Sequence, residues 1–145
     1  MTDAGKRYAD LLTSLRSERR RLKSQRKLLR VPRAALSRSD REIVLRKTDG
    51  RCHICGGAID GRWEADHVLA HSVGGKHTAD NYLPAHATCN NYRWDYTAAE
   101  FQQILKLGVW ARTQVEKGTG IGREIASRFA AHEVNRVARR RARGS

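Results

Sequence analysis

Four side chains that bind metals stand in two closely spaced pairs along the 145-residue chain. The first pair is Cys52 and Cys55, and the second is His86 and Cys89. Two ligands separated by two residues bind one side of a tetrahedral zinc ion, and a second such pair completes the coordination. The two pairs use all three cysteines of the chain. The spacing therefore predicts a zinc site with four protein ligands.

The segment between and just after these pairs carries side chains suited to different chemistry. Asp66 and His67 are adjacent, Asn81 follows them, and Asn90 comes directly after Cys89. Imidazole titrates near neutral pH and can take a proton from water, whereas carboxylate and amide oxygens bind hard cations. An acid, a histidine and an asparagine are more than a purely structural zinc site requires.

The charge of the chain indicates a polyanionic partner. The net charge is +14, and it is unevenly distributed. Residues 1–47 contain 15 Lys/Arg and 5 Asp/Glu, and residues 96–145 contain 10 and 4, whereas residues 48–95 contain 4 and 6. Basic flanks around a slightly acidic centre are the layout expected of a phosphodiesterase, with arms that hold the backbone and a centre that holds a cation. Solvated helix faces are the alternative for any single arginine.

The cysteine content and the absence of long apolar runs bear on the location of the protein. Three cysteines and no apolar leader predict a reducing, cytoplasmic setting without disulfides, consistent with a bacterial or phage origin. No run approaches the length of a membrane span, so we expect no membrane partner. A homodimer is compatible with the sequence but is not required by it.

The basic N-terminal segment is expected to form a helix from Lys6 to Arg30, ended by Pro32. Tyr8, Leu15, Leu22 and Leu29 recur at seven-residue intervals along it. This stripe could pack on the domain or pair with a second copy, and polar Glu18, Arg19 and Gln25 beside it favour packing on the domain. A basic cluster on the same helix is expected to face phosphate. It includes Arg19, Arg20, Lys23, Arg26 and Lys27.

The central elements are expected to be short. Ser39 with Glu42 reads as a capping box that opens a second helix with Ile43, Val44 and Leu45 as its apolar positions. Residues 63–69 alternate roughly between apolar and polar, as in a strand, and Gly74-Gly75 turns the chain back toward an extended piece at 81–83. A further helix should begin after Cys89, with Asn90 and Arg93 in its first turn.

The C-terminal third is expected to be helical. Thr97 with Glu100 forms a second capping box, and the helix that follows should continue past Gly108. Gly118 to Gly122 interrupt it, and a last helix leads to the Arg139-to-Arg143 tail. The three tryptophans, Trp63, Trp94 and Trp110, are expected to be core residues rather than stacking platforms for bases, with stacking kept as the alternative for Trp94 beside Arg93.

The stretch from Asp49 to Arg93 resembles the zinc-containing branch of the HNH endonucleases. The matching pieces are Asp-Gly-Arg-Cys-His-Ile-Cys-Gly, Ala-Asp-His-Val, Gly-Gly, Asp-Asn-Tyr-Leu-Pro and Cys-Asn-Asn-Tyr-Arg. The resemblance implies a ββα-metal core, a β-hairpin followed by a helix around one catalytic metal. It covers roughly a third of the chain. His86 stands where many members have a third cysteine, and Asn90 stands where the last histidine of the family name lies, a known variant.

The resemblance also implies roles for single residues. His67 is the expected general base, and Asp66 and Asn90 are the expected ligands of Mg²⁺ or another divalent cation. Asn81 is expected to fix the hairpin through backbone groups and so orient His67. Arg93 is a candidate phosphate clamp. Because neighbours on a regular strand point to opposite faces, Asp66 and His67 can share one site only if the strand ends or kinks there.

The predicted fold is therefore α+β and mostly helical, with a ββα-metal core and a structural zinc site between basic helices. The expected parts are 1–38 (basic helix and connector), 39–96 (nuclease core) and 97–145 (helical extension). A metal-dependent DNA endonuclease is the favoured function. A zinc-organised nucleic-acid-binding module without catalysis is the alternative, and RNA is a weaker third option as substrate. For His53, His71 and His77, solvation or hydrogen bonding is favoured over metal binding.

Overall fold

A computed structural model describes residues 2–28, 35–71 and 74–142. Leu29, Arg30, Pro32 and Arg143, and the side chains of Arg26, Leu28, Arg140 and Arg141, lie outside the described part. The chain divides into two compact units, residues 1–101 and 102–145. Each unit is described by itself, and the part boundaries expected at 38/39 and 96/97 stay a prediction. None of the described helices combines the length and apolar character that a membrane crossing requires.

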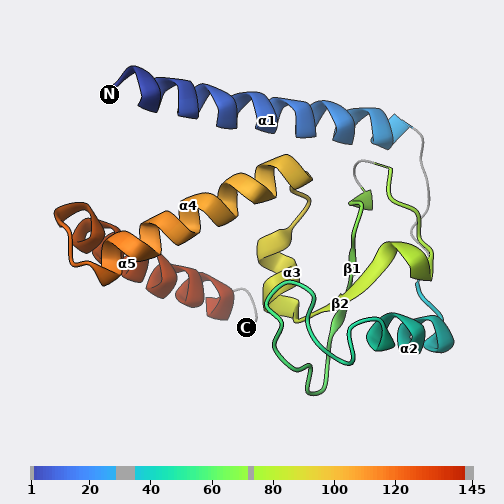
Figure 1. Cartoon of the computed structure of the whole chain (residues 1–145). Helices are drawn as coiled ribbons and strands as arrows, with labels where there is room; N and C mark the ends of the chain where they lie inside the picture. Colours follow the sequence, from blue (N-terminus) through green and yellow to red (C-terminus); the bar gives the residue numbers. More distant parts are fainter. Residues whose placement is uncertain (1, 29–34, 72–73, 143–145) are drawn as a thin grey trace. The chain divides into compact units, whose positions relative to one another are not determined.

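The first unit holds the predicted hairpin-and-helix core (Figure 1). Strand β1 (Glu64–His67) pairs antiparallel with β2 (Tyr82–Ala85), with Asp66 opposite Leu83 and His67 opposite Tyr82. A 3₁₀ turn, Ala79–Asn81, leads into β2, and α3 (Ala87–Arg93) follows it directly. The α+β, mostly helical fold class is thereby confirmed. The sequence predicted that α3 would begin after Cys89, and this is wrong. The helix begins before Cys89, because the chain becomes helical immediately after β2.

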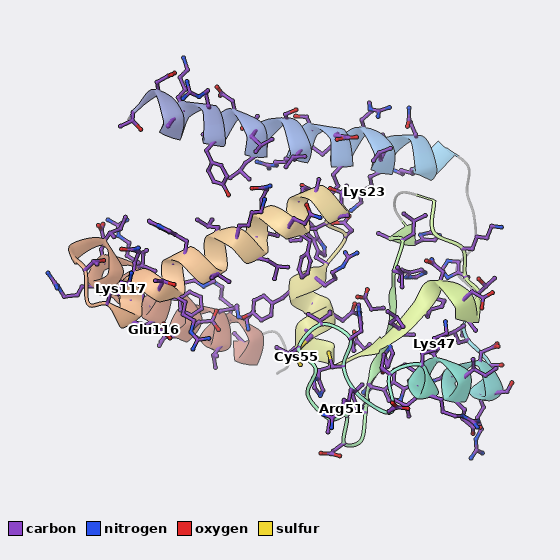
Figure 2. The ribbon with its side chains drawn as sticks, viewed as in Figure 1. Lys23, Lys47, Arg51, Cys55, Glu116 and Lys117 are labelled. Carbon is purple, nitrogen blue, oxygen red and sulfur yellow. The ribbon has the colours of Figure 1, made fainter. Side chains whose placement is uncertain are left out.

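Helix α2 (Arg38–Arg46) holds the hairpin from outside. Its cap is Ser37, whose hydroxyl accepts a hydrogen bond from the Asp40 amide at 3.1 Å, so the expected start at Ser39 is two residues late. Of its three apolar positions, only Val44 is fully buried. Just after the helix, Lys47 (labelled in Figure 2) donates to the carbonyls of Ala79 (2.6 Å) and Tyr82 (3.3 Å), which ties α2 to the start of β2.

Helices α4 (Ala98–Glu116) and α5 (Gly120–Ala142) make up the C-terminal third. The Thr97 capping box is confirmed, since the Thr97 amide donates to the Glu100 carboxylate at 3.0 Å and the Glu100 amide to the Thr97 hydroxyl at 3.3 Å. Helix α4 runs through Gly108, as expected. A Cβ on Gly122 would lie 2.0 Å from the Gln114 carbonyl oxygen, so only glycine allows this approach of α5 to α4.

The tryptophans are less buried than expected. Trp94 is 54% exposed and Trp110 is 46% exposed, while Trp63 is half-buried beneath the Arg41 guanidinium. The core expectation is therefore wrong for Trp94 and Trp110. The apolar core is small, and its buried hydrophobic members are Val44, Cys52, Ala70, Tyr82 and Ala85.

Helix α1 (Asp3–Leu28) is anchored through a buried arginine. Arg19 is 8% exposed and its Nε donates to both carboxylate oxygens of Glu100, at 2.9 and 3.0 Å. Its Nη1 lies 3.2 Å from Asp95, which also pairs with Lys23 at 2.8 Å. Arg19 was expected to face phosphate, but it neutralises two carboxylates instead. The apolar stripe of α1 is only partly covered, with Tyr8, Leu15 and Leu22 half-buried.

Glu100 both caps α4 and neutralises Arg19, so we expect its loss to destabilise the fold strongly. Glu100→Ala leaves a buried guanidinium without its main partner, which typically costs about 3–5 kcal/mol of unfolding free energy. The matched control is Glu116→Ala, which removes an exposed pair with Arg112 on the same helix and should cost at most about 1 kcal/mol. Urea unfolding monitored by circular dichroism measures both. Equal losses for the two variants would contradict this role of Glu100.

Candidate metal centre and catalytic cleft

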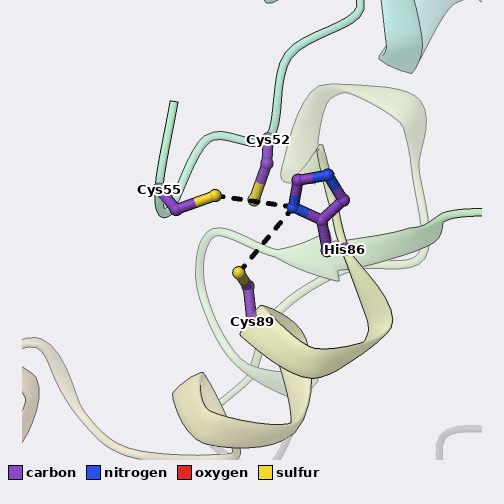
Figure 3. Close-up of side chains that lie close together, drawn as sticks. All are labelled: Cys52, Cys55, His86 and Cys89. Atoms are coloured by element: carbon purple, nitrogen blue, oxygen red, sulfur yellow. Dashed lines mark hydrogen bonds between the residues drawn. The ribbon is translucent and has the colours of Figure 1, made fainter. Parts of the chain in front are cut away.

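The four predicted zinc ligands converge at one point (Figure 3). The ligand atoms of Cys52, Cys55, His86 and Cys89 all lie within 4.8 Å of one another. The sulfurs of Cys55 and Cys89 lie 3.4 and 3.9 Å from Nδ1 of His86, close to the edges of a tetrahedron with zinc–ligand bonds of about 2.0–2.3 Å. Three thiols and one imidazole form a donor set that zinc favours.

Local backbone structure brings these ligands together. The Gly56 amide donates to the Cys52 carbonyl at 2.8 Å, and the Cys52 amide donates to the Gly57 carbonyl at 2.9 Å, which closes a tight turn around Cys55. Gly56 has φ 73°, a conformation that favours glycine. His86 caps α3 and Cys89 lies in its first turn, so the second pair is held by the end of β2 and the helix that follows.

A hydrogen bond to the Ala58 carbonyl determines which ring nitrogen of His86 faces the cysteine sulfurs. Nε2 of His86 lies 2.9 Å from the Ala58 carbonyl oxygen, which can only accept, so Nε2 carries the proton. Nδ1 is then left with its lone pair toward the cysteines, the tautomer that a metal ligand needs. The hydrogen bond to Ala58, followed by that to Cys55, raises the pKa of His86.

The thiols differ in their tendency to ionise. Burial raises the pKa of Cys52, but amide donors at Cys55, His86 and Ile54 outweigh it and lower the pKa from 9.0 to about 6. Burial and the neighbouring thiols raise the pKa of Cys89 to about 12. Negative charge on one sulfur therefore opposes charge on the next, and a shared dication removes that opposition. With four ligands, the tetrahedron has no open position for water, which is typical of a structural site.

A separate cleft of about 920 Å³ lies in the same unit and contains the predicted general base and both predicted cation ligands. Asp66, His67 and Asn90 all line it. Strand β1 ends at His67, so the alternation that would place Asp66 and His67 on opposite faces stops there. The structure brings these three residues together, while Asn81 and Arg93 are not part of the cleft lining.

Asp66 is held by a residue of the zinc turn. Its side chain is 6% exposed, and Oδ2 lies 2.8 Å from Nε2 of His53. Because an ionised carboxylate only accepts, His53 donates this bond. His53 stands between Cys52 and Cys55, so the turn that carries two zinc ligands also orients the buried carboxylate. His53 was expected to form a hydrogen bond, and the structure identifies its partner as Asp66. The spacing of residues along the sequence did not indicate this partner.

His67 lies in a cluster of rings. Its ring centroid is 4.2 Å from that of Tyr82, its partner across the hairpin, and its Nε2 is 3.3 Å from Nδ1 of His77. The same Nδ1 lies 2.6 Å from the Tyr82 hydroxyl, and the rings of His71 and His77 are tilted at 42° with centroids 4.5 Å apart. Tyr82 is 4% exposed, so the cluster fixes the His67 ring from its buried side.

Asn90 is oriented by an acid that sequence reasoning missed. Its Nδ2 donates to Oε2 of Glu64 at 2.5 Å. Because the amide nitrogen is used in this way, the amide oxygen remains for a cation. Glu64 precedes Asp66 by two positions, and period-two alternation on a strand was the signal that could have placed both carboxylates on one face. Two carboxylates and an amide oxygen are donors that fit Mg²⁺ or Mn²⁺.

The side-chain amide of Asn81 forms three hydrogen bonds with backbone groups. Its Oδ1 accepts from the Leu69 amide at 2.9 Å, and its Nδ2 donates to the carbonyls of Leu69 and Lys76, both at 3.0 Å. These bonds fasten the loop that joins β1 to β2. A Cβ on Gly75 would lie 1.8 Å from the Leu69 carbonyl oxygen, so this loop also requires glycine there.

The expected phosphate-binding residues fall into different environments. Arg93 is half-buried and donates to the carbonyl of Tyr96 at 2.9 Å, so it supports the chain after α3 rather than standing open as a clamp. Arg20 and Lys27 are exposed on α1. Lys23 is 57% exposed at its side chain and lines the cleft beside Asp95. The side chain of Arg26 lies outside the described part.

Removing one zinc ligand should unfold the first unit, because its apolar core is small and metal binding contributes to folding. His86→Ala should lose bound zinc, measured by mass spectrometry of the metal, together with the cooperative thermal transition. His86→Cys should retain both, since a thiolate replaces the imidazole. The matched control His132→Ala removes an exposed histidine of α5 and should change neither. A zinc-free His86→Ala protein with an unchanged Tm would refute the site.

Comparison with known families supports the same segment of the chain. Residues 52–93 match the family described as HNH endonuclease. Neither the curated proteins nor the solved structures gave a match to the chain. The matched segment contains all four zinc ligands, both strands, α3 and the side chains that meet in the cleft. Residues 52–93 of this protein are therefore similar to the HNH endonuclease family.

Proposed function

We propose that this protein is a metal-dependent DNA endonuclease that hydrolyses phosphodiester bonds. The observation that carries the proposal is the meeting of Asp66, His67 and Asn90 in one cleft beside a separate four-ligand cluster. A zinc module that only binds nucleic acid has no need of a carboxylate, an amide oxygen and an imidazole in one cavity. The basic charge of the flanking segments fits a polyanionic substrate.

In this proposal the side chains divide the chemistry among them. Asp66 and Asn90 hold one divalent cation, with Glu64 orienting the Asn90 amide. When bound, this cation neutralises charge on the phosphate and on the leaving 3′ oxygen. His67 takes the proton of the attacking water as the new phosphorus–oxygen bond forms and the bond to the 3′ oxygen breaks. The leaving oxygen takes a proton from solvent.

The remaining residues act by position. His77 and Tyr82 limit the rotation of the His67 ring, which keeps the base aimed at the water. His53 does the same for Asp66. Asn81 holds the loop after β1 and so the backbone on which His67 sits. In this proposal, exposed basic side chains of α1, including Arg20 and Lys27, attract DNA. Arg19 takes no part, because its charge is neutralised inside the protein.

The alternative is a non-catalytic nucleic-acid-binding module that uses the same zinc cluster and charge. Incubation of the purified protein with supercoiled plasmid separates the two functions. Relaxed or linear products with Mg²⁺ or Mn²⁺, absent without added cation, support the endonuclease. Binding of plasmid without cleavage under any divalent cation supports the binding module.

Loss of the base and loss of a cation ligand should have different signatures. His67→Ala should reduce cleavage by at least about 10²–10⁴-fold, because no group then takes the proton from water. Asp66→Ala should also reduce cleavage, through weaker cation binding, so higher Mn²⁺ should restore part of the rate. Plasmid-nicking rates over a Mn²⁺ titration measure this difference.

The control for both variants is His132→Ala, which lies outside the cleft and should cleave at the wild-type rate. All three variants should keep their zinc and a cooperative thermal transition, which confines the loss of cleavage to chemistry. His67→Ala that cuts as fast as wild type would exclude this mechanism, and so would full rescue of His67→Ala by Mn²⁺.

Removal of exposed α1 charges should reduce the salt dependence of DNA binding. Each lost phosphate contact lowers the slope of log affinity against log salt by about 0.9 for duplex DNA, so Arg20→Ala with Lys27→Ala should lower it by nearly two units. Arg7→Ala is the control on the same helix, because Arg7 is already paired with Asp3. Fluorescence anisotropy at several salt concentrations gives the slopes. Unchanged slopes in the double variant would mean that α1 faces something other than DNA.

A further inference from the structure

We propose that Trp94 is a stacking platform for an unpaired nucleobase at the edge of the cleft, so that the substrates of this protein include nucleic acid with an unstacked base. The proposal rests on the proposed action on nucleic acid and names its substrate class. It concerns a side chain just beyond the matched family segment, which ends at residue 93.

The position and exposure of Trp94 set it apart from the other aromatic side chains of the cleft. Trp94 lines the same cavity as Asp66, His67 and Asn90 and is 54% exposed. Tyr82 is buried at 4% exposure, and Trp63 is covered by the Arg41 guanidinium at 4.1 Å from its ring centroid. Trp94 is therefore the aromatic ring of the cleft lining with the most open surface among the described residues.

The indole is held in place from the side of α1. The Arg19 guanidinium carbon lies 4.6 Å from its centroid and Lys23 Nζ lies 5.7 Å away. Because Arg19 and Lys23 are one helical turn apart, both approach the ring from the same side. Tyr96 meets the indole in an edge arrangement, with centroids 5.3 Å apart at 79°. Arg19 is itself fixed by Glu100, so the ring is ordered before any ligand arrives, which reduces the entropic cost of binding.

The backbone of Trp94 adopts a conformation that a bulky residue rarely takes. Its φ is 48° and its ψ is −144°, in a region that glycine favours. Asp49 is the other non-glycine residue with positive φ among the described residues. Glycine at the end of α3 would be the easier choice for folding. Strain of this kind clusters at binding sites, where a side chain is needed despite its cost.

The surroundings indicate which ligand fits the ring. Asn91, Asp95 and Lys23 line the cleft next to Trp94, so the environment is polar rather than suited to a lipid or an apolar peptide. A nucleobase offers a flat π-face for the indole and polar edges for its neighbours. Bases inside a duplex are already stacked on one another, so the indole face is available only to a base that is unpaired or extruded.

Binding of three oligonucleotide probes, without added Mg²⁺ or Mn²⁺, tests the proposal. The probes are a single strand, its perfect duplex, and that duplex with one unpaired base. Trp94→Ala should weaken binding of the single strand and of the unpaired-base duplex by about 10-fold and leave the perfect duplex unchanged. Trp94→Phe should stay close to wild type because it keeps a ring. Trp110→Ala, which removes an exposed tryptophan of α4, should affect none of the probes.

Trp94→Gly keeps the proposal testable if the alanine variant folds poorly, because glycine adopts this φ without strain. It should show the same probe-selective loss with a cooperative thermal transition. Equal losses on all three probes, no loss on any, or a loss confined to the perfect duplex would overturn the proposal. Wild-type plasmid cleavage run in parallel separates the two hypotheses. Cleavage without probe selectivity rejects only the stacking site, and selectivity without cleavage rejects only the endonuclease.

Discussion

The convergence of four ligand atoms from two distant parts of the chain is the constraint on which the first unit depends. Among the described residues of this unit, five hydrophobic side chains are buried, and two of them are alanines. Hydrophobic burial of this extent contributes little stability at this size, so coordination of one zinc ion would supply what the core lacks. Where the turn at Cys52 and Cys55 meets the start of α3, negative charge on Cys52 disfavours ionisation of Cys89, and a shared cation would favour it.

The zinc cluster and the cleft are joined through nearest neighbours in the sequence. His53 follows the ligand Cys52 and donates to Asp66, and Asn90 follows the ligand Cys89 and donates to Glu64. In each ligand pair, one ligand is therefore followed directly by a residue whose side chain contacts an acid of β1. These two hydrogen bonds link the ligand cluster to the residues of the proposed cation site.

The ligand pairs, the hairpin and the sharing of one cleft by Asp66 and His67 could be predicted because their signals are local: spacing, turn glycines and order along the chain. Contacts between distant residues could not. Nothing in the spacing of basic residues distinguishes Arg19 from Arg20, yet one is buried against Glu100 and the other is exposed, because which face of α1 meets α4 depends on tertiary packing. For the same reason the sequence did not indicate Glu64 as the partner of Asn90. The start of α2 was expected two residues late because both Ser37 and Ser39 are suitable caps.

The contacts of α2 with the hairpin have a consequence for how the hairpin and its ligand cluster could be moved between proteins. Lys47 bonds the carbonyls at the start of β2, Val44 fills the core beneath the hairpin, and Arg41 donates to the Trp63 carbonyl. All three precede residue 52, where the family segment begins. A graft of residues 52–93 into another scaffold would carry every zinc ligand and every proposed catalytic group and still lack α2, the helix that keeps β2 in register. The smallest transferable unit therefore begins no later than Ser37. A recombination point at residue 52 would separate the hairpin from α2.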